Sequence, residues 1–460
     1  MNVVFCSSEI SPFAKTGGLG DVGLALPKSL AKAGCVVKVF MPLYKNIVPE
    51  ENYKYFGVNR RGNLEIFFIK NSSYFKRKFI YGTKTKDYPD NLERFSFFSR
   101  RVLEILKQIN FIPDIIHNND WHSSLVSVYF KILYKSDKFF QNTKLLLTIH
   151  NLAYQGLFSK DKFFCLGIPN KYFSLRYLKF YDQINVLKGG IVFSDMVNTV
   201  SLSYAKQIKS SEHGCGLNKA LKNKSTGIRG ILNAVDYDVW NPRTDKLIYR
   251  KYSIDTLKNK TFNKVRLQKE LGLKINKNSF LLVMVSRLAE QKGLDLLNEV
   301  LDFILQKHQV VILGTGNVKY HRSLAKIQEK FKNSFSVQLK FDEKLAHKIY
   351  AAGDCFLMPS RFEPCGLSQL ISYKYATVPI VYHTGGLIDT VKDISQGGGG
   401  VVFKKYTHTC FLSAVKRAER VFNRKDKWNS ILKKISRYDF SWDKTAQEYI
   451  NVYKKLGKKK

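Results

Sequence analysis

The sequence is short of several features that would point to particular classes of protein. Its 460 residues include only seven cysteines, and no two of them form a Cys-x-x-Cys pair. Neither a zinc site nor a disulfide framework is therefore indicated. No run approaches the roughly 18 apolar residues of a membrane-spanning helix, and a strand-like run begins almost at once. We therefore expect a cytoplasmic protein with no membrane partner.

Acidic residues are also scarce. The chain has 37 acidic residues against 76 lysines and arginines, for a net charge of +39. Such a charge attracts phosphate backbones. However, the basic residues are spread along the whole chain and accompany no nucleic-acid-binding motif. We predict a lysine-rich surface and no specific nucleic-acid partner.

The two best-known phosphate-binding glycine motifs are missing. Lys15 precedes its glycines, which excludes a Walker loop, and Gly17-Gly18-Leu19-Gly20 does not fit Gly-x-Gly-x-x-Gly. Instead, the segment 16–21 (TGGLGD) returns near the other end of the chain as 384–389 (TGGLID). Glycines let backbone N–H groups approach an anion at a helix N-terminus. The repeat therefore indicates two similar nucleotide-binding halves.

Apolar strand-like runs alternate with helical patterns, which is typical of parallel α/β sheets. The runs are 36–41, 64–69, 115–116, 145–149, 196–200, 280–285, 310–313, 355–358 and 378–381. The polar stretch that starts at 241–245 lacks a buried-strand pattern and is interpreted as a linker. We predict domains at 1–242 and 243–441, followed by a helical segment at 442–460.

Candidate phosphate and sugar ligands lie beside the predicted strand ends and glycine loops, where open α/β sheets bind ligands. Lys15 can reach an anion held by the first glycine loop. Arg287 and Lys292 follow the run 280–285 and suit a diphosphate. Glu363, after another strand, can accept hydrogen bonds from sugar hydroxyls. Cys365 is interpreted as a small packed residue and not as a nucleophile.

Histidines follow two strands of the first half. His117, Asp120, His122 and His150 have no spacing that matches a metal motif, so we predict no metal site. His150, directly after a buried strand, is better placed to meet a substrate. The pair Asp236 and Asp238 is interpreted as turn residues.

Together these segments resemble bacterial glycogen synthases and plastid starch synthases, which are retaining glucosyltransferases of GT-B fold. The similarity runs nearly end to end. It rests on the segments 15–21, 88–95, 120–122, 150–156, 231–233, 240–242, 286–295, 359–367, 384–391 and 439–442. The resemblance implies two Rossmann-like domains whose parallel sheets face each other across a cleft. It also implies glucose transfer from ADP-glucose to the non-reducing end of an α-1,4-glucan, no cofactor, and a C-terminal helix that packs on the first domain.

The resemblance also implies roles for individual residues. Lys15 and the Gly17 and Gly18 amides would hold the donor phosphates from one side, and Arg287 and Lys292 from the other. His150, Asn233 and Glu363 would contact the glucose. The remaining substrate-binding positions are Asp21, Asn151, Phe341, Cys365, Gly366, Thr384, Gly385 and Gly386.

Three positions depart from the family pattern. Phe341 stands where tyrosine often stacks on adenine, Tyr382 where arginine is common, and Ala376 where glycine is common. Two other interpretations stay open from the sequence. One is a phosphorylase-like enzyme, which would need pyridoxal phosphate and a much longer chain. The other is a non-enzymatic basic binding protein that kept a transferase fold.

Overall fold

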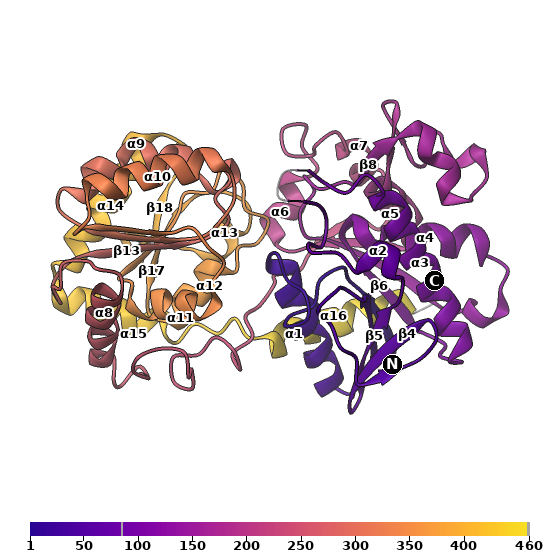
Figure 1. The fold of residues 1–460 in the computed structure, drawn as a ribbon, viewed down its shortest axis with the longest axis horizontal. Coiled ribbons are helices and arrows are strands. Elements are labelled where there is room, and N and C mark those ends of the chain that lie inside the picture. The colour runs from indigo at the N-terminus through magenta and orange to yellow at the C-terminus, as the bar shows by residue number, and fades with distance from the viewer. Residues whose placement is uncertain (84–85, 458–460) are drawn as a thin grey trace. The chain divides into compact units, whose positions relative to one another are not determined.

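The chain folds into two compact units, which a computed structural model describes for residues 1–83 and 86–457 (Figure 1). Unit 1 consists of Met1–Asn233 with the segment from Trp442 onward, and unit 2 of Ala234–Ser441. The predicted domain boundary at 242–243 lies later in the chain than this division. The last three residues of the predicted segment 442–460 lie outside the described residues.

Unit 1 is built on a sheet of nine strands in the order β12-β11-β7-β6-β1-β2-β5-β4-β3. All strands from β12 to β5 run parallel, and β4 and β3 add an antiparallel edge. The strands are β1 (Asn2–Cys6), β2 (Val36–Pro42), β3 (Glu51–Asn52), β4 (Phe56–Arg61), β5 (Leu64–Ile69), β6 (Ile115–Asn119), β7 (Lys144–Ile149), β11 (Met196–Thr199) and β12 (Ile228–Gly230). The residues of the central strands β1, β6, β7 and β11 are almost all buried, which is the pattern of a sheet covered on both faces.

Helices connect these strands as the alternating pattern predicts. They are α1 (Gly18–Lys32), α2 (Ser72–Phe75), α3 (Asn91–Gln108), α4 (Asp120–Leu133), α5 (Val186–Phe193), α6 (Leu202–Gln207) and α7 (Asn218–Lys222), with short 3-10 helices η1 (Lys138–Phe140), η2 (Lys160–Leu166) and η3 (Asn170–Tyr172). A separate antiparallel sheet in the order β8-β10-β9 was not predicted from the sequence. Its strands are β8 (Leu157–Ser159), β9 (Lys179–Phe180) and β10 (Gln183–Asn185).

The last helix, α16 (Trp442–Gly457), belongs to unit 1 and packs against α1. Its Tyr453 hydroxyl lies 2.8 Å from His117 Nδ1, and its Tyr449 hydroxyl accepts a hydrogen bond from Asn198 at 3.1 Å. The apolar face seen in the sequence is thus buried on the parallel sheet, with its polar atoms paired.

Unit 2 contains a six-stranded, fully parallel sheet in the order β15-β14-β13-β16-β17-β18. The strands are β13 (Leu281–Val285), β14 (Gln309–Leu313), β15 (Phe335–Gln338), β16 (Cys355–Met358), β17 (Val378–Tyr382) and β18 (Val401–Phe403). This is the strand order of a Rossmann fold. The helices are α8 (Lys258–Glu270), α9 (Leu294–Leu305), α10 (Val318–Lys330), α11 (Glu343–Ala352), α12 (Ser368–Lys374), α13 (Gly386–Thr390), α14 (His408–Phe422) and α15 (Lys425–Ile435), with 3-10 helices η4 (Glu290–Lys292) and η5 (Ile394–Gln396).

The segment interpreted as a linker is anchored in unit 2. Asp245 and His347 are buried and joined at 2.7 Å, and the Tyr375 hydroxyl donates to the same carboxylate at 2.5 Å. The Trp240 ring stacks on His347 with centroids 3.9 Å apart. The segment is therefore held in place although it forms no strand, because the buried carboxylate of Asp245 has two hydrogen-bond partners.

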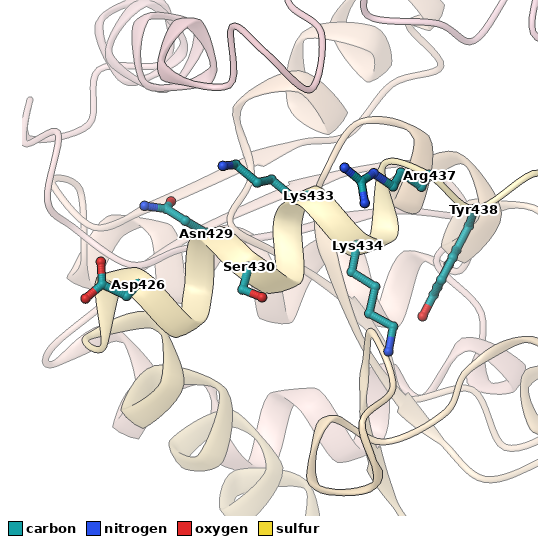
Figure 2. Close-up of a pocket in the computed structure, with 7 residues that line it drawn as sticks. All are labelled: Asp426, Asn429, Ser430, Lys433, Lys434, Arg437 and Tyr438. Carbon is teal, nitrogen blue, oxygen red and sulfur yellow. The ribbon is translucent and has the colours of Figure 1, made fainter.

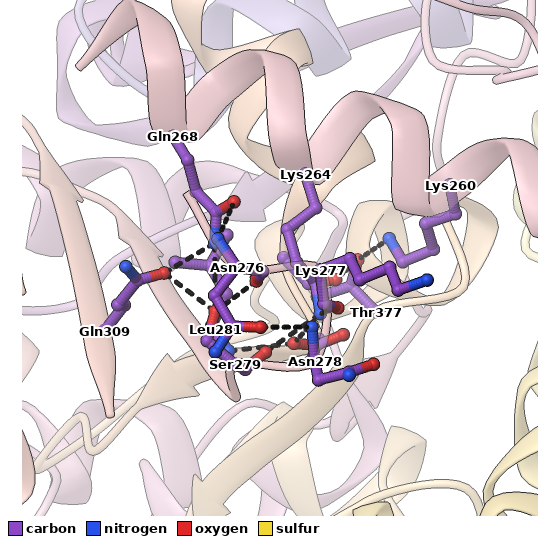
Figure 3. A network of polar contacts seen from close by, with 12 residues as sticks. Lys260, Lys264, Gln268, Asn276, Lys277, Asn278, Ser279, Leu281, Gln309 and Thr377 are labelled. Carbon is purple, nitrogen blue, oxygen red and sulfur yellow. Dashed lines mark hydrogen bonds and ion pairs between the residues drawn. The ribbon is translucent and has the colours of Figure 1, made fainter. Parts of the chain in front are cut away.

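Helix α8 is fastened to the sheet of unit 2 by buried polar side chains (Figure 3). Lys264 Nζ pairs with Asp354 at 2.6 Å and donates to the Ser279 carbonyl at 3.0 Å. Gln268 donates to Gln309 at 2.7 Å. The Lys264 and Asp354 side chains are 5% and 8% exposed, so water cannot replace either partner.

We expect Lys264→Met to lower the stability of unit 2 by about 3–5 kcal/mol, because it leaves the Asp354 carboxylate buried without its cation. Urea unfolding followed by circular dichroism measures the effect. The control is Lys330→Ala, which breaks the exposed pair with Asp302 and should cost less than about 1 kcal/mol. Equal shifts for the two variants would contradict the prediction.

None of the helices in the described part of the chain is long and apolar enough to cross a membrane.

Candidate functional site

The predicted site residues gather at the carboxyl edges of the two parallel sheets. In unit 2, β13 lies between β14 and β16, and in unit 1, β1 lies between β2 and β6. The strand order reverses its direction at these central strands, and such a switch point is where open α/β sheets bind ligands.

In unit 2, the loop after β13 meets the loop after β16. Lys292 Nζ donates to Glu363 Oε2 at 2.6 Å, and the Ser360 hydroxyl donates to the same oxygen at 3.0 Å. The lysine side chain is 17% exposed and the glutamate 8%. Two residues 71 positions apart therefore form an ordered, partly buried ion pair.

The second glycine loop, residues 384–386, contacts the backbone of Glu363. Gly386 N donates to the Glu363 carbonyl at 2.9 Å. Gly385 has φ +48°, and a Cβ there would lie 1.9 Å from that carbonyl oxygen. Only glycine fits such a left-handed position under a carbonyl. The buried Thr384 precedes it, so this loop holds the Glu363 backbone in place.

The other predicted residues of unit 2 differ in exposure. Arg287 is exposed after β13, and Phe341, between β15 and α11, is 68% exposed. Cys365 is buried beside Gly366, with its Sγ 3.6 Å from that residue's carbonyl oxygen, which confirms its interpretation as a packed residue. Tyr382 is half-buried against the rings of Phe403 and Tyr406. Tyr382 therefore packs as one member of an aromatic cluster.

In unit 1, Lys15 lies at the start of the first glycine loop and pairs with Asp21 at 2.6 Å. Both side chains keep some exposure, 17% and 30%. Gly17 is the N-cap of α1, and no side chain caps this helix. The N-terminus of α1 therefore lies next to a fixed ammonium group, an arrangement that favours an anion.

Sequence reasoning missed Glu9, which organises this loop. Its buried carboxylate accepts hydrogen bonds from Thr16 N at 2.5 Å, from Gly17 N at 3.2 Å and from the Tyr81 hydroxyl at 2.6 Å. The Gly17 amide, expected to face a phosphate, therefore donates to a carboxylate. The one available signal in the sequence was that Glu9 comes three residues after the strand β1 and shortly before the glycine loop. The contact with Tyr81 had none.

His150 follows β7 and is neutral at physiological pH, because burial lowers its pKa to about 3. Its Nε2 lies 2.9 Å from Asn119 Oδ1. Asn119 Nδ2 donates to the Cys6 carbonyl at 3.0 Å, which fixes the orientation of the amide. Nε2 must therefore carry the proton, and Nδ1 is left as a hydrogen-bond acceptor.

The carboxylate of Asp120 binds backbone N–H groups of the loop that carries His150. Asp120 was not among the predicted site residues. Its Oδ1 accepts from His150 N at 2.7 Å and from Asn151 N at 3.4 Å. Asp120 opens α4 with φ +54°, a left-handed conformation that is uncommon for a non-glycine residue. Burial raises its pKa to about 7, although the two backbone hydrogen bonds act in the opposite direction.

The remaining polar residues of the strand ends have separate environments. His117 is hydrogen-bonded to Thr148 and Tyr453, and His122 stacks on Tyr81 with ring centroids 4.5 Å apart. Within residues 1–83 and 86–457, no three His, Cys, Asp or Glu side chains are gathered as metal ligands. Asn233 is 5% exposed, and its Oδ1 has no hydrogen-bond partner among the described residues. An unpaired buried acceptor is costly, so this atom is a candidate for contact with a ligand.

A surface pocket of about 700 Å³ lies along α15, away from these loops (Figure 2). No predicted site residue lines it. Its lining residues are Asp426, Asn429, Ser430, Lys433, Lys434, Arg437 and Tyr438. Lys433 and Lys434 lie in the last turn of α15, where a positive charge complements the negative end of the helix dipole. The helix therefore accounts for the position of these lysines. The candidate site is therefore placed at the strand ends.

Comparisons with known proteins identify the family of the chain. Residues 2–223 match the family model "Starch synthase catalytic domain", and residues 267–433 match "Glycosyl transferases group 1". The chain is 42% identical to a glycogen synthase of Thermotoga petrophila, with 99% of each chain covered, and 43% identical to one of Thermosipho melanesiensis over the full length of both.

The chain belongs to the glycogen and starch synthase family. Its fold is GT-B, like that of the catalytic domain of starch synthase IV from Arabidopsis thaliana bound to ADP and acarbose, which has a TM-score of 0.91 and 34% identity over 99% of each chain. Family membership makes the protein a glucosyltransferase of the glycogen synthase type. The phosphorylase-like interpretation and the non-enzymatic one are therefore set aside.

Proposed function

We propose that the protein transfers glucose from ADP-glucose to the non-reducing end of an α-1,4-glucan, with retention of the anomeric configuration. The observation that carries the proposal is the Lys292–Glu363 pair, held at the switch point of a Rossmann sheet by a glycine loop. The pair offers a fixed cation for a diphosphate and a carboxylate for sugar hydroxyls. The cytoplasmic location remains the prediction made from the sequence.

In unit 2, Arg287 and Lys292 neutralise the diphosphate of the donor. Arginine serves as a planar fork and lysine as a point charge. Glu363 accepts hydrogen bonds from the glucose, and the backbone around Cys365, Gly366 and the loop 384–386 orients the same sugar. The exposed Phe341 ring stacks on the base, since it has a free face and no hydroxyl is needed for stacking.

In unit 1, Lys15 and the N-terminus of α1 bind phosphate oxygens, and Asp21 holds the lysine in place. His150 faces the glucose with Nδ1 as an acceptor, because its other nitrogen donates to Asn119. Asn233 completes the hydrogen bonding of the sugar through its unpaired Oδ1. Asn151 also contributes to substrate binding, from the loop whose backbone is bound by Asp120.

The donor is tested with purified protein, a glycogen primer, and labelled ADP-glucose beside labelled UDP-glucose. We expect faster transfer from ADP-glucose. Phe341→Ala should raise the KM for ADP-glucose about tenfold, the scale of a lost base–aromatic stack. The control is Phe303→Ala, an exposed ring on α9 that packs under Lys416. Better turnover with UDP-glucose would overturn the proposed donor.

A further inference from the structure

We propose that Arg361 is a positioning residue for glucose transfer, which holds the Lys292–Glu363 pair in its working geometry. The proposal rests on the proposed function, in which Lys292 binds the diphosphate and Glu363 the glucose. Arg361 lies in the loop after β16, two residues before Glu363, and its side chain pairs with carboxylates of η4 and of the first turn of α9. It therefore joins the loop that carries Glu363 to the segment that carries Lys292.

Two carboxylates of that segment share the Arg361 guanidinium. Its Nη2 donates to Asp295 Oδ2, and its Nε lies 3.7 Å from Glu290 Oε1. Asp295 is in the first turn of α9, where a negative charge is favourable, and its side chain is 28% exposed. Because Glu290 and Asp295 lie on either side of Lys292 in the sequence, one arginine contacts the segment before and after the lysine.

An aromatic ring restricts the orientation of the same guanidinium. Its central carbon lies 4.7 Å from the centroid of the Tyr406 ring. The Tyr406 hydroxyl donates to Asp295 Oδ1 at 3.4 Å, and the ring packs edge-on against Tyr382 with centroids 5.1 Å apart. An exposed ion pair alone contributes little to stability. A planar guanidinium that is stacked on a ring and paired with a carboxylate, however, has a defined position.

The two segments also contact each other through their backbones. Arg361 N donates to the Gln291 carbonyl at 2.9 Å, and Gln291 Nε2 donates to the Phe362 carbonyl at 3.3 Å. Gly293 has φ +74°, and a Cβ there would lie 2.0 Å from the Pro359 carbonyl oxygen. The Arg361 side chain therefore adds to contacts that are already close. Its loss should shift the loop by a small distance without unfolding it.

The surroundings of Arg361 assign it an indirect role. The carboxylates of Glu290 and Asp295 offset its charge and would repel an approaching diphosphate. Glu363 Oε2, in contrast, accepts from Lys292 and from the Ser360 hydroxyl, and Ser360 directly precedes Arg361. A shift at Arg361 thus moves Glu363 relative to its hydrogen-bond donors. A displacement of ~1 Å in such groups can cost ~10²-fold in rate.

Arg361→Ala should lower the kcat of glucose transfer about 10- to 100-fold and raise the KM for ADP-glucose less than about threefold, because the positioned groups act mainly as charge develops. Asp295→Ala should have a similar effect. The double variant should be no slower than the slower single variant, since both substitutions remove the same contact. Arg361→Lys keeps a cation within reach of the carboxylates and should recover part of the rate. Initial rates of variants whose thermal unfolding matches the parent measure these effects.

The matched control is Arg60→Ala. Arg60 is 46% exposed, against 45% for Arg361, and pairs with Glu51 at 2.8 Å in unit 1, so its loss should leave kcat unchanged. In a Lys292→Ala background, Arg361→Ala should lower kcat by a smaller factor than in the parent, because the lysine that it positions is absent. An equal factor in both backgrounds would overturn the positioning role. So would an Arg361→Ala enzyme with a kcat within about threefold of the parent, far above the loss expected for misplaced groups.

Hydrogen exchange tests the contact without a donor. Gly386 N donates to the Glu363 carbonyl, so its exchange reports on the position of the loop. Peptides that cover 360–366 and 384–388 should exchange at least about threefold faster in Arg361→Ala than in Arg60→Ala. Unchanged exchange would overturn the inference. If the parent transferred glucose from neither ADP-glucose nor UDP-glucose, the proposed function would fail, and faster exchange would still leave the contact of Arg361 with the loop established.

Discussion

Lys15→Ala should lower the turnover of glucose transfer by about two to four orders of magnitude. Removing a single preorganised electrostatic contact typically costs ~10²–10³ in rate, and under the proposed function this lysine also positions the donor. Its ammonium is held by Asp21 at 2.6 Å beside the uncapped start of α1. Under the proposed function, the lysine and the N-terminus of α1 bind the same phosphate. Initial rates with saturating ADP-glucose and glycogen measure the effect.

The control is Lys32→Ala, at the other end of the same helix. Lys32 pairs with Asp443 at 3.3 Å, and both side chains are largely exposed, so its loss should leave the rate nearly unchanged. Asp21→Asn is informative as well, because it frees the Lys15 ammonium without removing it. A Lys15→Ala enzyme within threefold of the parent would make Lys15 a surface residue with no part in transfer.

The parallel sheets were predictable because their strands are buried on both faces and read as continuous apolar runs. The predicted runs 64–69 and 355–358 coincide with β5 and β16. Strands with alternating or polar residues, such as β4 and β15, gave no such signal. Their place is set by neighbours in the sheet, which periodicity along the chain does not reveal.

The candidate site was predictable where its residues end a buried strand. Lys292 and Glu363 could each be proposed from the sequence, because each follows a buried strand. Their contact could not, because it depends on β13 and β16 being neighbours in the sheet. Glu9 and Asp120 were missed for a different reason. Both act on the backbone of other loops, through the amides of Thr16 and His150, and such contacts depend on three-dimensional placement.

The last prediction concerns the negative charge that develops on the diphosphate when its bond to glucose breaks. A transferase meets this charge with a divalent metal or with fixed protein cations. The Asp-x-Asp pair at 236–238 is engaged in a turn, where Asp236 Oδ1 accepts from Asp238 N at 2.9 Å. Lys292, in contrast, is fixed at a strand-end loop by Glu363. Fixed cations are therefore expected to carry the leaving-group charge.

Activity should accordingly persist in EDTA, and Arg287→Ala and Lys292→Ala should each lower kcat by more than they raise KM. An interaction that strengthens as charge develops contributes to the transition state beyond its contribution to substrate binding. Lys330→Ala, an exposed paired lysine of unit 2, is the control and should match the parent. Thermal unfolding checks that Lys292→Ala, which leaves Glu363 without its cation, still folds. If chelation abolished activity and Mg²⁺ or Mn²⁺ restored it, the fixed-cation mechanism would be wrong, and the carboxylates of Asp236 and Asp238 would become the first candidates for metal ligands.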